Sequence, residues 1–163
     1  MTYVDTKEIL RFFAAELNKR MADKGVTYRQ VALAARVTRG SMVHYKSGNA
    51  FPELYTLILI ADYLDCSVDN LLGYKEETRY ESRSKVGNKR FMNEDELADY
   101  FRLRLYDYME MKSIDVEELS RRSEISVELI DMYLSVHRWV PRTPELLRLC
   151  SALNCTPSEL LGC

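Results

Sequence analysis

The side chains best suited to binding chemistry are concentrated between residues 27 and 49. The stretch "TYRQVALAARVTRGSMVHYKSGN" combines basic, hydroxyl and amide groups, which are the groups that bind phosphate oxygens in nucleic acids. Arg39 can also donate two hydrogen bonds to O6 and N7 of one guanine, which provides about 1–3 kcal/mol of base discrimination. Tyr28, Lys46 and Asn49 flank it on both sides. The combination predicts a surface for recognising a nucleic acid.

Catalytic and metal-binding chemistry have no comparable support. The sequence contains no Ser-His-Asp-like set and no Gly-rich phosphate loop, so we expect no enzymatic activity. Its cysteines and histidines lack the short paired spacings of metal ligands, so we expect no metal and no cofactor. The cysteines should instead be small, reduced, buried residues. The cysteines are Cys66, Cys150, Cys155 and Cys163, and the histidines are His44 and His137.

The pattern around residues 27–49 occurs a second time. An offset of 88 residues aligns the two occurrences, and one extra residue near positions 136–140 changes the offset to 89. The closing segment "LLG" at 71–73 then matches "LLG" at 160–162. These matches indicate two copies of one fold. Other aligned pairs are Val31 with Leu119, Met42 with Ile130, Tyr45 with Tyr133, Pro52 with Pro141 and Cys66 with Cys155.

Each copy has the periodicity of a run of short helices, with apolar residues on one side of each. Polar residues stand where helix N-caps are needed, and Pro52 is expected to open a helix over residues 53–64. The expected caps are Thr6, Thr27, Thr38 and Ser67 in the first copy and Asn93, Asp115, Ser126 and Thr156 in the second. In the first copy we expect Val31, Ala32, Ala35, Met42 and Tyr45 to face the core. The pattern predicts an all-α protein with five helices per copy.

Charge and hydropathy divide the chain into three parts. Residues 1–73 carry a net charge of +1, and residues 91–163 carry −6. Between them lies a polar, charged stretch without an apolar period, which we interpret as a linker over residues 74–92. We therefore expect domains at 1–73 and 93–163. Because no signal peptide or long apolar run is visible, we expect a cytoplasmic protein without a membrane span.

The first copy resembles the Cro/lambda-repressor-like, or XRE-type, helix-turn-helix family. The matching segments are "VTYRQVALAARVTRGSMVHYKSGNAFP" and "LILIADYLDCSVDNLLG". They contain a capped helix with Ala32, a tight turn at 36–37, a second capped helix, a Gly, a Pro and a closing Leu-Leu pair. The second copy, residues 101–162, resembles the family more weakly and has Val136 in place of Gly48.

The resemblance implies two tandem five-helix lambda-repressor-like domains joined by a charged linker. It also implies a dimeric, sequence-specific regulator of transcription, with repression as the favoured role and double-stranded DNA and a second copy of the chain as partners. In this family the helix after the turn enters the major groove. No motif indicates a small-molecule ligand. The DNA-binding residues carried over to this chain are Tyr28, Arg29, Thr38, Arg39, Gly40, Ser41, Val43, His44, Lys46, Ser47 and Asn49.

The second copy keeps the apolar pattern and changes the charges. Glu124, Glu128 and Asp131 lie on and around its equivalent helix, and no Lys or Arg occurs within 123–137. DNA phosphates repel such a surface, so we expect it to contact protein, with Trp139 and Arg138 as candidate interface residues.

Two alternatives stay open at this point. The whole chain could be an interaction protein, such as an antirepressor or an antitoxin, built on the same fold. Both copies could also bind DNA in tandem, for which Arg121 and Arg122 would have to supply the contacts.

Overall fold

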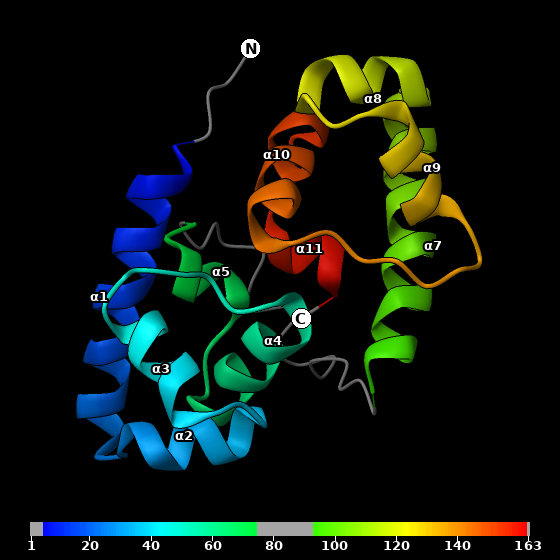
Figure 1. The fold of residues 1–163 in the computed structure, drawn as a ribbon. Coiled ribbons are helices and arrows are strands. Elements are labelled where there is room, and N and C mark those ends of the chain that lie inside the picture. Colours follow the sequence, from blue (N-terminus) through cyan, green and yellow to red (C-terminus); the bar gives the residue numbers. More distant parts are fainter. Residues whose placement is uncertain (1–4, 75–92, 163) are drawn as a thin grey trace. The chain divides into compact units, whose positions relative to one another are not determined.

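A computed structural model of the chain describes residues 5–74 and 93–162. Within these ranges it forms ten helices and no strand, in two compact units (Figure 1). The expected all-α, two-domain fold is therefore confirmed. The expected linker lies, except for Tyr74, outside the described residues, so the domain boundaries stay a prediction.

The first domain contains the five helices expected from its periodicity. The helix predicted at 53–64 begins one residue later and ends one residue earlier. The helices are α1 (Thr6–Lys24), α2 (Tyr28–Ala35), α3 (Arg39–Lys46), α4 (Leu54–Tyr63) and α5 (Val68–Leu72).

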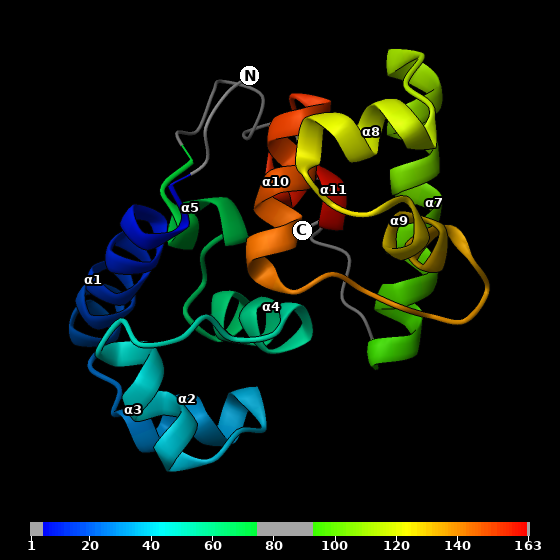
Figure 2. The ribbon, with the colours of Figure 1, turned by 45° about the horizontal axis from the view of Figure 1, so that its top comes forward.

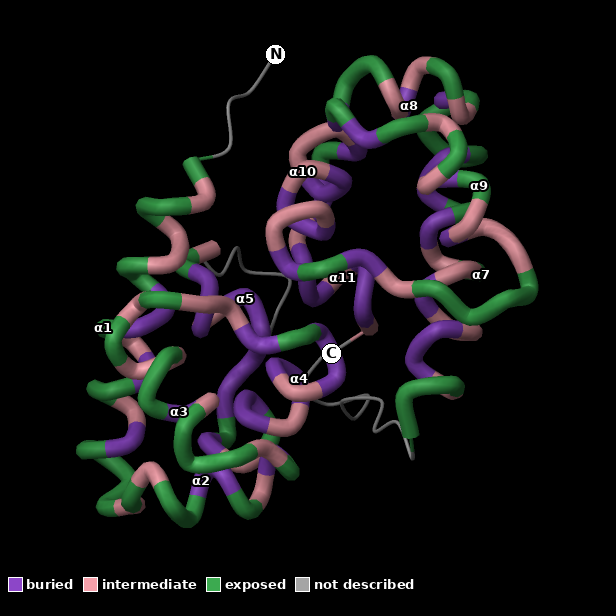
Figure 3. The backbone as a smooth tube through the Cα atoms, viewed as in Figure 1, coloured by how far each residue is buried: buried purple, intermediate pink, exposed green. Residues whose placement is uncertain are grey.

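The core of the first domain forms where α2 packs between α3 and α4, while α1 packs against α3 and α5. Each helix contributes buried apolar residues to it, as the purple stretches in Figure 3 show. Burying one such side chain contributes about 1.5–3 kcal/mol. The predicted core residues Val31, Ala32, Ala35 and Met42 are buried, and Tyr45 is half-buried.

The second domain repeats this order with the predicted offsets. Its first three helices begin 88 residues after their counterparts, and its last two begin 89 residues after theirs. The extra residue therefore falls in the loop between the third and fourth helices of the domain. The helices are α7 (Glu94–Lys112), α8 (Val116–Ser123), α9 (Val127–Leu134), α10 (Thr143–Leu153) and α11 (Pro157–Leu161).

Seven of the eight expected N-caps are confirmed, because each side chain accepts a hydrogen bond from a backbone N–H in the first turn of its helix. These caps are Thr27, Thr38, Ser67, Asn93, Asp115, Ser126 and Thr156. The expectation for Thr6 is wrong. Asp5 caps α1 instead, since its Oδ1 accepts from the N–H groups of Lys7 and Glu8, both at 3.1 Å. A carboxylate there also suits the positive end of the helix dipole.

The cysteines pack as expected. Cys66, Cys150 and Cys155 are buried and free of disulfides, and Cys163 lies outside the described residues. Burial raises the pKa of the Cys66 thiol to about 11, which keeps it protonated and unreactive at neutral pH.

Candidate nucleic-acid interface

Helices α2 and α3 are joined by a tight turn that local chemistry defines at both ends. Thr27 and Gln30 form a reciprocal capping box at the start of α2. Arg36 adopts a left-handed conformation with φ of 59°, which ends α2. The Val37 N–H then donates to the Ala32 carbonyl over 3.0 Å, and Thr38 caps α3. Figure 2 shows the two short helices side by side.

The helix α3 separates core residues from residues available for contact. Met42 is fully buried, whereas Arg39, Gly40, Val43 and His44 are exposed. All four belong to the predicted DNA-binding residues, among which Arg39 is the predicted base reader. A Cβ added to Gly40 would meet only the Thr38 hydroxyl, at 3.8 Å, so packing does not require glycine there and the position stays open to an approaching partner.

The ring of Tyr28 lies near one cation of α2 and one of α3. The Lys46 ammonium lies 5.1 Å from the ring centroid, and the Arg29 guanidinium carbon lies 5.9 Å from it. A hydrogen bond to Arg29, followed by the charge of Arg29, lowers the pKa of the Tyr28 phenol below its usual 10. The charges of Arg39 and Lys46 act in the same direction. We call Tyr28, Arg29, Arg39 and Lys46 the basic surface.

The positive charge of the basic surface is not neutralised within the described residues. None of its three cations pairs with a described carboxylate. Neither α2 nor α3 has an acidic residue in its first turn, so the N–H groups and positive dipole ends there can act on an anion. The sequence has no Asp or Glu between Asp23 and Glu53, a signal that the cap and core patterns alone do not reveal.

The remaining predicted contact residues are partly used in holding α3. The Thr38 and Ser41 hydroxyl oxygens lie 3.0 Å apart at the start of α3. At its end the Ser47 hydroxyl donates to the Val43 carbonyl over 2.8 Å. Asn49 is exposed, and its backbone N–H donates to the His44 carbonyl over 3.0 Å. Thr38 directly precedes Arg39 in the chain, and Ser47 directly follows Lys46.

Two side chains that position this region have no recognisable sequence signal. The Asn18 amide of α1 donates to the Lys46 carbonyl over 2.9 Å and to the Ala14 carbonyl over 2.8 Å, which holds the end of α3 on α1. Arg36 extends from the turn to the Tyr55 hydroxyl of α4, at 3.5 Å.

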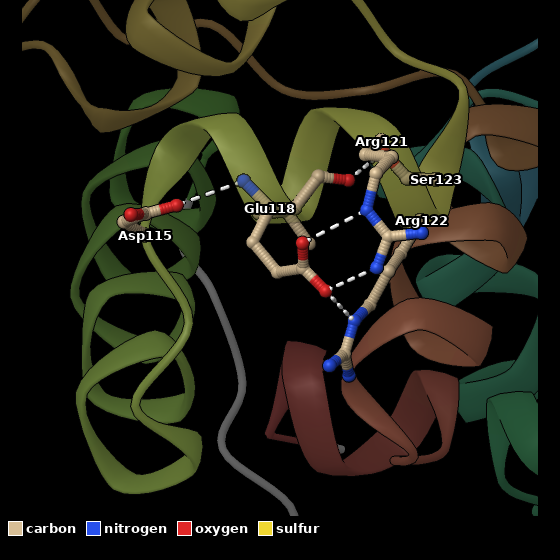
Figure 4. A network of polar contacts seen from close by, with 6 residues as sticks. Asp115, Glu118, Arg121, Arg122 and Ser123 are labelled. Atoms are coloured by element: carbon tan, nitrogen blue, oxygen red, sulfur yellow. Dashed lines mark hydrogen bonds and ion pairs between the residues drawn. The ribbon is translucent and has the colours of Figure 1, made fainter.

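The equivalent surface of the second domain has the opposite charge. Glu117 and Glu118 lie in the first turn of α8, and Glu128 lies in the first turn of α9. Glu118 binds both cations of α8, with Arg121 Nε at 2.9 Å and Arg122 Nε at 2.7 Å (Figure 4). These hydrogen bonds lower the pKa of Glu118 to about 2.

The two candidate interface residues lie in the loop between α9 and α10. Arg138, at φ of 60°, binds the α7 carboxylates of Asp95 at 3.2 Å and Asp99 at 3.3 Å. It therefore fastens the loop to its own domain. Trp139 beside it is half exposed, at 50 %.

Other kinds of site find no additional support. No group of three or more possible metal-ligating side chains gathers within the described ranges. Among the same residues, no helix combines the length and apolar character needed to cross a bilayer.

Comparison with known proteins agrees with the repeated geometry. Residues 16–77 and residues 104–163 each match the family model of the Cro/C1-type HTH DNA-binding domain. No curated protein and no solved structure matches the chain. The two matches cover more than half of the sequence, and each begins within the first helix of one domain. The chain belongs to the Cro/C1-type HTH DNA-binding domain family, whose domain it contains twice.

Proposed function

We propose that this protein is a sequence-specific transcriptional regulator that reads double-stranded DNA through its first domain. In this proposal α3 enters the major groove, where Arg39, Val43 and His44 contact base edges. Arg29, Lys46 and the N-terminus of α2 contact phosphates on either side. The observation that carries the proposal is the basic surface, with cations that no described acid neutralises.

The contrast between the domains supports assigning DNA binding to the first. Both domains share the fold, so the fold cannot distinguish their roles. The first presents cations and acid-free helix starts, while the second presents carboxylates and engages Arg121 and Arg122 through Glu118. We propose that the second domain contacts protein, and that tandem DNA binding does not occur.

We further propose that the protein acts in the cytoplasm as a homodimer and as a repressor. A single recognition helix contacts only a few base pairs, and dimers of such domains bind two half-sites about one helical turn apart. A bound dimer covers its site on the DNA, which favours repression.

The test is to select bound fragments from random DNA with the intact protein and with Arg39→Ala. We expect the wild type to enrich a two-fold symmetric site, and Arg39→Ala to lose discrimination at one position of each half-site. The expected loss is about 1–3 kcal/mol per position. Arg11→Ala is the matched control, because Arg11 is also an exposed arginine but lies in the first half of α1, outside α2 and α3.

Failure of the wild type to enrich any site at modest salt would contradict the proposal. The chain would then be better explained as an interaction protein, such as an antirepressor or an antitoxin. Equal effects of Arg39→Ala and Arg11→Ala would contradict the role of α3 while leaving DNA binding intact.

A further inference from the structure

The second domain exposes an apolar stripe on α7 that its fold does not require. Leu103, Tyr106 and Met111 are 55, 59 and 65 % exposed. Leu103 lies three residues before Tyr106 and eight residues before Met111, spacings that place all three on one broad side of the helix. In α1 of the first domain, the equivalent positions are Ala15, Asn18 and Asp23, all exposed.

Acidic residues accompany the stripe. Asp107 and Glu110 are exposed on the same side of α7, and neither carboxylate pairs with a cation among the described residues. About two to four turns earlier on α7, Asp95 and Asp99 are separated by four residues, and Arg138 binds both of them. The chain itself therefore shows how a guanidinium fits between two carboxylates on this side of α7.

We propose that the α7 stripe docks a basic amphipathic helix of another protein. The apolar side of such a helix would cover Leu103, Tyr106 and Met111, and its Lys or Arg residues would neutralise Asp107 and Glu110. A second copy of this domain is a poor occupant, because two stripes facing each other would oppose the same carboxylates. The inference rests on the proposed protein-contact role of the second domain and is independent of DNA reading.

The internal repeat supplies variants that suit the fold. Leu103→Ala, Tyr106→Asn and Met111→Asp together install the residues that α1 carries, and so does the pair Asp107→Lys and Glu110→Ala. The matched control is Leu33→Ala, because Leu33 is an exposed leucine of the first domain. Unchanged thermal unfolding of each variant would confirm that the fold is retained.

The probe is a labelled synthetic helix with Leu on one side and Lys on the other, compared with a scrambled peptide of the same composition. Binding to the full chain is measured by fluorescence anisotropy at physiological salt. We expect the amphipathic peptide to bind about tenfold more tightly than the scrambled one, a difference of about 1.4 kcal/mol. The triple and double variants should each abolish this preference, and Leu33→Ala should keep it.

Three outcomes would overturn the proposal. The first is equal binding of both peptides by the wild type, and the second is a preference that survives in both α7 variants. The third is a dimer in sedimentation analysis that the triple variant abolishes, because the stripe would then be covered by a second copy. DNA selection with the same variants separates this failure from failure of the proposed function, since neither variant alters the first domain.

Discussion

Lys46→Ala should reduce the salt dependence of DNA binding by an amount that follows from the basic surface. Two cations of that surface, Arg29 and Lys46, are assigned to phosphates, and neither pairs with a described carboxylate. Each phosphate contact releases counterions and contributes about 0.9 to the slope of log K against log salt. A dimer with two such surfaces makes four side-chain contacts to phosphates and should have a slope of about −3.6, whereas Lys46→Ala should have a slope of about −1.8.

The assay is anisotropy titration of a selected DNA site at several salt concentrations, with the stoichiometry measured in parallel. Between 50 and 200 mM salt, the wild type should lose about 150-fold in affinity and Lys46→Ala about 12-fold. Arg11→Ala should retain the wild-type slope. A Lys46→Ala protein that binds DNA with an unchanged slope would refute the assignment of Lys46 to phosphate.

Three further outcomes test other parts of the structure. The wild type should lose DNA affinity in alkaline solution, because nearby cations lower the pKa of the Tyr28 phenol and its ionisation places a negative charge beside the phosphates. Tyr28→Phe should not show this loss, which anisotropy across a pH series measures. Glu118→Gln should flatten the acid side of the curve of melting temperature against pH. The depressed pKa of Glu118 contributes stability that is present above its ordinary 4.5 and is lost as the pH falls through about 2. Leu119→Ala should lower the free energy of unfolding of the second domain by about 2–5 kcal/mol in denaturant titration, because Leu119 is fully buried.

Features that depend on neighbouring residues could be predicted from the sequence. A cap such as Thr38 needs only a hydroxyl beside the first turn, and a buried residue such as Met42 needs only its place in the helical period. The internal repeat supported both kinds of prediction, because aligning the two copies showed the same cap and core positions in each. The error at Thr6 was also local, since Asp5 and Thr6 are adjacent and both can act as caps.

Features that depend on residues far apart in the chain could not be predicted. The hydrogen bond from Asn18 to the Lys46 carbonyl spans 28 residues, and the ion pair of Arg138 with Asp95 spans 43. Nothing in their local sequences distinguishes these residues from solvated surface residues. The identities of the basic-surface residues were expected, but the position of Lys46 over the Tyr28 ring depends on how α2 and α3 pack.

The shared register of the two domains has a consequence for mutational tolerance. Caps, left-handed turn residues and buried positions recur 88 residues apart up to the loop at 136–140 and 89 residues apart after it, as with Arg36 and Glu124 or Asp65 and Asn154. A comprehensive substitution scan scored for folding should therefore show the same pattern of intolerant positions in both domains. The same scan scored for DNA binding should add exposed positions of the first domain, such as Arg39 and His44, with no exposed counterparts in the second.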